Sequence, residues 1–393
     1  MIKLTHLFTY YQSLGGVQSI LRRHYRHDEQ FGIDSRFCIF FEAAQDSRIT
    51  GLSLTGANSI HGLRRRFASA HEPTEVAFYH NGWGVHMAAD LDRCSRRIAL
   101  LHSAYPNLEQ ELRHSHHLYD GIAAVSQPLL DCALAHLPEV EGRTTVLPLP
   151  ISSAFPLCQL PILNRPIKIG FIGRIVREQK RVDRIPRFAA ALAGTGIPAT
   201  LEFLGEGPEM SWLKSALHGH NASFHGLRSG DDYWRILASW DFILFTSDYE
   251  GLPISLLEAL SAGVLPLFPR INSGGDSYAA RLFHGLLYET EAWEELVRTI
   301  GSLAKLPPDT LAGVRQKAQS LAREHAGGAY DRRFSEFIAE TCEKPRISTG
   351  TFAPRSASIL DHMPIGALTR TQSRRFFYCP PPAAEGSFSA TTK

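Results

Sequence analysis

The sequence lacks several features that mark whole classes of protein. No stretch approaches the ~20 consecutive apolar residues of a membrane-spanning helix, and residues 1–10 lack the unbroken apolar segment of a signal peptide. The six cysteines are scattered without a C-x-x-C pair, which fits neither a disulfide framework nor a zinc site. Lysine and arginine exceed aspartate and glutamate by only two, so the strong positive field of a nucleic-acid-binding protein is missing. We therefore expect a cytoplasmic protein that binds no nucleic acid.

Length and residue pattern indicate two α/β domains. A chain of 393 residues is long for one hydrophobic core, because domains usually contain roughly 100 to 200 residues. Short apolar runs rich in β-branched and aromatic residues alternate with longer amphipathic stretches, which is typical of strands and helices around parallel sheets. The predicted strands are 3–8, 35–40, 97–101, 121–125, 168–172, 200–204 and 242–245.

Proline and loss of pattern mark the domain boundaries. Prolines cluster between residues 145 and 166, and because proline fixes φ and removes a donor, this stretch is predicted to be a linker. We place the boundary near residue 160, which gives a first domain over 1–160 and a second over 161–325. Residues 343–393 have little apolar periodicity and are predicted to form a poorly ordered tail.

A basic loop follows the first strand of the second domain. Residues 168–172 form that strand, and Gly173 and Arg174 open the loop at its carboxyl end, where open α/β sheets bind ligands. Arg174 supplies a planar fork of donors and Lys180 a compact cation, a pair suited to a leaving diphosphate. The alternative is that the charges from Arg177 to Arg184 form the solvated face of a helix start.

Two glutamates border a second predicted loop and helix. Pro253 suits a first helical turn, so the free amides of Ile254 and Ser255 would point at an anion. Glu250 precedes this helix and Glu258 lies about one and a half turns inside it, so the two carboxylates would reach different depths of one ligand. The alternative, a loop charge and a helical surface residue, fits less well beside so apolar a helix.

Three motifs in this order resemble the family-four retaining glycosyltransferases. They are Gly173-Arg174 with Lys180, then Gly205-Glu206-Gly207-Pro208, then Glu250-Gly251-Leu252-Pro253 with Glu258. The resemblance implies the GT-B fold, in which two Rossmann-like doubly wound domains face each other across a cleft. It also implies that Arg174 and Lys180 grip the donor diphosphate, that Glu250 approaches the donor sugar and that Glu258 binds the ribose. A terminal helix over 326–342 is then expected to cross back to the first domain.

The first domain offers weaker signals. Gly15 and Gly16 follow the opening strand and resemble the family's glycine-rich loop that faces the diphosphate, where glycine lets backbone approach a ligand closely. His102 ends a predicted strand and resembles the histidine that the family places beside the donor sugar. The family often has aspartate where Ser103 stands here, and the alternative for His102 is a core histidine with satisfied hydrogen bonds.

Three further patterns are assigned no ligand. The run 114–117 contains three histidines without suitably spaced carboxylates, so we predict no metal site, and the resembled family needs none. Arg64, Arg65 and Arg66 fall short of a polybasic membrane anchor. Met210 stands where the third glycine of G-x-G-x-x-G would be, which disfavours a dinucleotide enzyme.

The resemblance thus implies a retaining, metal-independent hexosyltransferase without a cofactor. Its donor is expected to be a nucleotide diphosphate sugar and its acceptor a saccharide or a lipid-linked glycan in cell-surface polysaccharide biosynthesis, with peripheral contact at the inner membrane face left open. Alternatives are a non-catalytic GT-B protein that binds sugar nucleotides and an epimerase of the same fold. The donor sugar, the base and the acceptor are set by variable loops and are not readable from the sequence.

Overall fold

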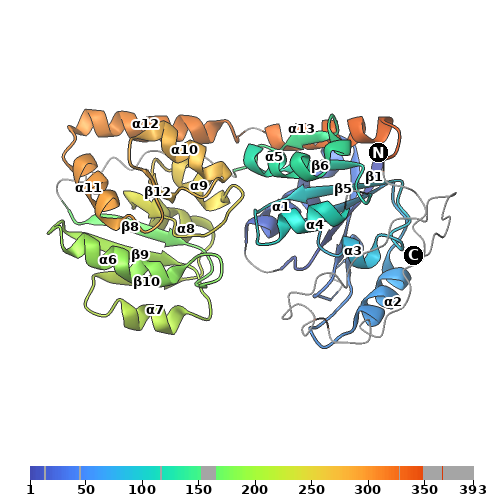
Figure 1. The fold of residues 1–393 in the computed structure, drawn as a ribbon, viewed down its shortest axis with the longest axis horizontal. Coiled ribbons are helices and arrows are strands. Elements are labelled where there is room, and N and C mark those ends of the chain that lie inside the picture. The colour runs from blue at the N-terminus through green and yellow to red at the C-terminus, as the bar shows by residue number, and fades with distance from the viewer. Residues whose placement is uncertain are drawn as a thin grey trace, which may run out of the picture.

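The computed structural model describes residues 1–12, 15–43, 46–115, 117–151, 165–326, 328–347 and 365. The chain forms two α/β lobes that lie side by side (Figure 1). The boundary that we place at residue 160 and most of the tail from 348 onward lie outside the described residues.

The first domain is built on a parallel sheet of seven strands in the order β3-β2-β1-β4-β5-β6-β7. The chain moves outward from β1 in one direction and then from β4 in the other, which is the doubly wound arrangement. The strands are β1 (Ile2–Phe8), β2 (Ile33–Ile39), β3 (Ile49–Gly51), β4 (Val76–His80), β5 (Arg96–Leu101), β6 (Gly121–Ala124) and β7 (Thr144–Val146). The helices are α1 (Gly16–His27), η1 (Asp28–Phe31), α2 (Ile60–Ala70), α3 (Val85–Ala88), α4 (Leu108–Ser115), α5 (Gln127–His136) and η2 (Pro138–Val140).

The second domain repeats this architecture with six strands in the order β10-β9-β8-β11-β12-β13. The order reverses between β8 and β11, so the ligand-binding crevice of an open sheet is expected at their carboxyl ends. The strands are β8 (Ile167–Ile172), β9 (Ala199–Leu204), β10 (Ala222–Gly226), β11 (Phe242–Leu244), β12 (Leu265–Pro269) and β13 (Leu287–Tyr288). The helices are η4 (Val182–Arg184), α6 (Ile185–Ala193), α7 (Met210–Ala216), α8 (Gly230–Leu237), α9 (Ile254–Ser261), α10 (Gly274–Leu282), α11 (Trp293–Ala304) and α12 (Pro308–Arg323). They are followed in sequence by α13 (Ala329–Glu343).

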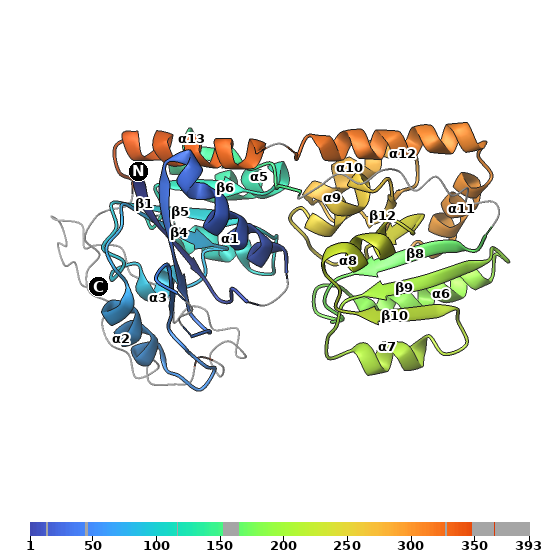
Figure 2. The same cartoon turned by 180° about the vertical axis from the view of Figure 1, so that it is seen from behind.

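The last helix, α13, lies on the first domain although it follows the second in sequence (Figures 1 and 2). Tyr330 and Phe334 are each about 1% exposed and pack beside the first sheet. Arg23 on α1 donates from Nε to Asp331 Oδ1 over 2.7 Å. The chain therefore crosses between the lobes twice.

The two domains also touch directly at the carboxyl ends of their sheets. Ser103, just after β5, forms an isolated antiparallel bridge with Gly251, just before α9. A Cβ at Gly251 would lie 2.1 Å from the carbonyl oxygen of His102, so only glycine permits this approach. The fold is two doubly wound domains meeting at their ligand-binding edges, and the predicted fold class is confirmed.

Candidate active site between the two domains

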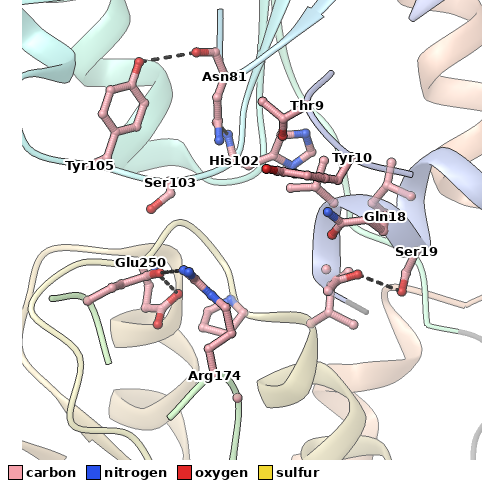
Figure 3. A pocket seen from close by; sticks show the side chains of 18 of the residues that line it. Thr9, Tyr10, Gln18, Ser19, Asn81, His102, Ser103, Tyr105, Arg174 and Glu250 are labelled. Carbon is pink, nitrogen blue, oxygen red and sulfur yellow. Dashed lines mark hydrogen bonds between the residues drawn. The ribbon is translucent and has the colours of Figure 1, made fainter. Parts of the chain in front are cut away.

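A cavity of about 1820 Å³ lies between the domains, and both sheets contribute the loops at their carboxyl ends to its wall. Figure 3 shows His102 and Ser103 of the first domain facing Arg174 and Glu250 of the second. The predicted site residues on the wall are Gly15, Gly16, His102, Gly173, Arg174, Lys180, Glu250, Leu252, Pro253, Ile254, Ser255 and Glu258.

Gly251 is also a predicted site residue, but it is not on the cavity wall. Its backbone is pressed against that of residues 102 and 103, as described above. This glycine therefore serves the contact between the domains rather than the lining of the cavity.

Lys180 and Glu250 form a hydrogen-bonded ion pair at the cavity. Lys180 Nζ donates to Glu250 Oε1 over 2.6 Å, and Ser247 Oγ donates to the same oxygen over 2.7 Å. The Glu250 side chain is about 7% exposed and that of Lys180 about 14%. The family resemblance assigns these two residues to different parts of a donor, whereas the structure joins them by a hydrogen bond. Since an ammonium group has three donors, Lys180 can hold Glu250 and still bind an anion.

The other charges of the basic loop divide into two groups. Arg174 is exposed at the cavity, with Nη2 donating to Gln179 Oε1 over 2.9 Å. Arg177 pairs with Glu209, while Arg181 and Arg184 both pair with Asp248, and none of these three arginines lines the cavity. Structural pairing thus explains those three, and Arg174 and Lys180 remain as the cations that face the cavity from this loop.

Two helices from opposite domains begin at the cavity. Helix α9 has Pro253 as its N-cap residue, so the proline precedes the first helical residue instead of occupying the first turn. The first intrahelical bond runs from Leu256 N–H to Pro253, which leaves the amides of Ile254 and Ser255 without an acceptor inside the helix. Helix α1 begins beside them, because a Cβ at Gly16 would lie 3.5 Å from Ile254 Cδ1. Both positive dipole ends favour an anion between them.

Glu258 lies on the cavity wall, and its carboxylate is largely shielded from solvent. Tyr233, which the sequence analysis did not single out, donates its hydroxyl hydrogen bond to Glu258 Oε2. Burial raises the pKa of Glu258 to about 7, and the Tyr233 bond opposes this shift only in part. The carboxyl group is therefore close to half protonated at neutral pH.

His102 lies at the carboxyl end of β5, on the cavity wall. Its backbone N–H donates to Asn81 Oδ1 over 2.7 Å, and its Nε2 lies 2.9 Å from His80 Nδ1. Burial is the largest cause that lowers the pKa of His102, to about 3, and the charge of His24 lowers it further. His102 is thus neutral at neutral pH.

The segments that follow β4 and β5 contribute wall residues that the sequence motifs did not indicate. Asn81, Trp83, Tyr105 and Glu111 line the cavity, and the Tyr105 hydroxyl donates to the carboxylate of Glu111. For Asn81 and Trp83, the sequence signal that could have found them was the turn His-Asn-Gly-Trp-Gly over 80–84. In this turn Asn81 has a positive φ of 54°. A turn of this kind after a buried strand marks a loop at the ligand-binding edge of a parallel sheet.

The patterns to which no ligand was assigned have structural explanations where they are described. Arg64 pairs with Asp90, and Arg66 donates to two backbone carbonyls, so two of the three arginines on α2 stabilise the first domain. In the histidine run, His114 lines the cavity, and residue 116 lies outside the described residues. Within the described residues, no helix is long and apolar enough to cross a membrane.

The comparisons with known proteins identify the second domain. Residues 159–321 match the sequence family described as "Glycosyl transferases group 1". The matched segment belongs to that family. No curated protein matches the chain in sequence.

Solved structures extend the likeness over both domains. The pneumococcal O-GlcNAc transferase GtfA, in complex with UDP and GlcNAc, aligns with TM-score 0.63 and 10% identity over 87% of this chain and 99% of its own. Anabaena Alr3699/HepE with UDP-glucose aligns with TM-score 0.61 and 15% identity over 87% and 100%. WaaG, a glycosyltransferase involved in lipopolysaccharide biosynthesis, aligns with TM-score 0.61 and 16% identity over 85% of this chain and 99% of its own. These likenesses show the fold, and the family and the fold together are those of GT-B glycosyltransferases.

Proposed function

We propose that this glycosyltransferase moves a hexose from a nucleotide diphosphate sugar to a saccharide or lipid-linked acceptor, with retention at the anomeric carbon and without a metal or cofactor. One observation carries the proposal. Arg174, Lys180 and the N-termini of α1 and α9 converge on one cavity that also has the carboxylates of Glu250 and Glu258 on its wall. Cations and helix N-termini suit a diphosphate, and carboxylates suit sugar hydroxyls.

The proposed roles follow from charge. Negative charge grows on the leaving diphosphate as the bond between the anomeric carbon and the phosphate oxygen breaks, and Arg174 with Lys180 stabilises it. The amides of Ile254 and Ser255 add two donors without a side chain. Glu250, already held by Lys180 and buried, accepts hydrogen bonds from the donor sugar. Contact between the domains excludes water from the reacting centre.

Isothermal titration with UDP, GDP, ADP and CMP tests the donor site. We expect one nucleoside diphosphate to bind, and Lys180→Ala to weaken it about 10- to 100-fold, because a charge-assisted hydrogen bond contributes about 1.5–3 kcal/mol. Glu258→Ala should weaken it too. Arg177→Ala is the matched control: it removes a cation from the same loop that pairs with Glu209 outside the cavity, so affinity should stay within about twofold.

The remaining parts of the proposal have separate tests. Product analysis by NMR gives the anomeric configuration, and unchanged turnover in EDTA supports metal independence. Binding of a nucleoside diphosphate without hydrolysis or transfer to any acceptor would favour the non-catalytic alternative, and no binding at all would reject the donor site.

The acceptor and its location belong to the same proposal. A lipid-linked acceptor would bring a cytoplasmic enzyme into peripheral contact with the inner face of a membrane. Co-sedimentation with anionic vesicles, with and without the acceptor glycan attached to lipid, measures that contact.

A further inference from the structure

A line of buried histidines connects the cavity with a buried carboxylate deep in the first domain. His102 Nε2 lies 2.9 Å from His80 Nδ1, and His80 Nε2 lies 3.1 Å from His6 Nδ1. His6 Nε2 in turn lies 3.4 Å from Asp28 Oδ2. His6 and His80 stand on the neighbouring strands β1 and β4 and are fully buried, and His102 directly follows the next strand, β5. We call the chain His102–His80–His6–Asp28 the relay. Of its four members, His102 lines the cavity and the other three lie behind it.

The carboxylate sets the direction of every hydrogen bond in the relay. Ser35 donates its hydroxyl proton to Asp28 Oδ2, and Ser35 Oγ also lies 3.4 Å from His6 Nε2. His6 Nε2 therefore faces two oxygen atoms that need a donor, so it must carry the proton. In a neutral imidazole the other nitrogen is then an acceptor, so His80 must donate to His6 from Nε2. By the same rule His102 must donate to His80 from Nε2, which leaves its Nδ1 unprotonated.

The surroundings favour this neutral, ordered state. Burial lowers the pKa of His6 to about 4 and that of His80 well below its ordinary value, with the charge of neighbouring histidines as the next cause. Asp28 stays ionised: burial raises its pKa, but His24 and His6 more than offset this, and the net shift is downward. The other carboxylate oxygen, Asp28 Oδ1, lies 2.9 Å from His24 Nδ1. The Nε2 atom of His24 lies 2.8 Å from the hydroxyl of Tyr330 on α13.

Packing against neighbouring aromatic rings fixes the orientation of the histidine rings in the relay. The His6 ring stacks on Phe37 with centroids 4.9 Å apart, and Phe334 of α13 covers it from 6.0 Å. The His80 and His102 rings are nearly parallel, at an interplanar angle of 14°. Among the described residues, no hydrogen bond to His102 Nδ1 is present. That lone pair is left for a ligand in the cavity.

We propose that His80, His6 and Asp28 are positioning residues that fix His102 in its Nε2–H tautomer, so that Nδ1 accepts a hydrogen bond from a hydroxyl group of the donor sugar. This inference rests on the proposed function. It narrows the donor to sugars that present a hydroxyl at that contact, since a group without a donor hydrogen would leave Nδ1 unpaired.

A metal bound at His6 would give the opposite tautomer of His102. The ligand-type atoms of His6, His24 and Asp28 lie within 4.8 Å of one another. A metal on His6 Nε2 would move the His6 proton to Nδ1 and reverse each bond of the relay, so that His102 would present an N–H to the cavity. Stoichiometric metal in the purified protein would therefore overturn the proposal.

Two substitutions at His80 separate the relay from general damage. His80→Leu removes the acceptor for His102 Nε2, whereas His80→Asn keeps an amide oxygen near the place of Nδ1. The measurement is the ratio of two affinities, that of the intact nucleotide sugar and that of its nucleoside diphosphate. We expect His80→Leu to lower the ratio about five- to tenfold, since one hydrogen bond to the sugar is lost. His80→Asn should restore the ratio to within about twofold of wild type.

Tyr330→Phe is the matched control, because it removes a buried polar group at the far end of the network and leaves the relay intact. Its ratio should equal that of wild type. The proposed role of the relay would be overturned if His80→Leu left the ratio unchanged, which includes the case in which both ligands bind more weakly by the same factor. Absence of nucleoside diphosphate binding by wild type would instead reject the proposed function, and the assigned ligand with it.

If His80→Leu does not fold, the histidine tautomers of the wild-type protein test the proposal instead. Long-range ¹H–¹⁵N spectra of histidine-labelled protein distinguish protonated from unprotonated ring nitrogens. We expect the neutral Nε2–H form for His102, His80 and His6 at pH 7, and an Nδ1–H form of His102 would overturn the inference.

Discussion

At the residue scale, Glu258 couples the donor site to the stability of the protein. Its pKa rises from 4.5 to about 7 on folding, so between these values the folded state binds more protons than the unfolded state. The free energy of unfolding therefore falls as pH rises through this window, and the stabilisation present below pH 4.5 is lost by about pH 7. Glu258→Gln cannot ionise and keeps an acceptor for Tyr233. Relative to wild type it should gain up to about 3 kcal/mol between pH 5 and pH 8.

Guanidinium unfolding of both proteins at the two pH values measures this gain. The control is Glu294→Gln, at an exposed position in the first turn of α11, which should show no such gain. A stability difference between Glu258→Gln and wild type that is the same at pH 5 and pH 8 would contradict the argument.

At the residue scale, the sequence locates side chains whose position is set by a local motif, and their roles in binding stay predictions. Lys180, Glu250 and Glu258 lie in short motifs whose spacing fixes their place on a loop and a helix, and all three line the cavity. The relay could not be predicted in this way. His6 and His80 are 74 residues apart, and only the pairing of β1 with β4 brings them together.

At the scale of elements, two glycines that look alike in the sequence should respond oppositely to alanine. A Cβ at Gly170 in β8 would lie 1.9 Å from the ring of Trp240, which is fully buried and held by its Nε1 donating to Glu202 over 2.9 Å. Gly170→Ala should therefore cost at least about 1–3 kcal/mol. Gly313, exposed in α12, has open space around its added Cβ, so Gly313→Ala should stabilise by about 0.5–1 kcal/mol. Denaturant unfolding gives both values, and the same sign for both would contradict the packing that we describe.

Some strands were predicted and others were missed, and the reasons for the misses differ from strand to strand. The seven predicted strands all match strands of the structure to within about two residues. β12 was missed because Pro266 and Pro269 within it disfavour a strand, yet it lies between β11 and β13 and is wholly buried. β4 carried a readable signal, the apolar run Val-Ala-Phe-Tyr over 76–79, and its omission hid the loop that holds Asn81.

At the scale of the whole molecule, α13 ties the stability of the first domain to residues that follow the second. Phe334 is about 1% exposed and contacts the rings of His24, with centroids 4.3 Å apart, and Phe78, with centroids 5.2 Å apart. Phe334→Ala should therefore destabilise the first domain by about 3–5 kcal/mol. The second domain is built on its own six-stranded sheet, so nucleoside diphosphate binding to it should persist.

Hydrogen exchange resolves the two domains in one experiment. In Phe334→Ala we expect faster exchange across residues 2–146 and unchanged exchange across 167–323. Glu336→Ala, an exposed position on the same helix, is the control and should leave both regions unchanged. Equal loss of protection in both domains would mean that the molecule unfolds as one cooperative unit, in which case α13 links the stabilities of the two domains instead of belonging to the first alone.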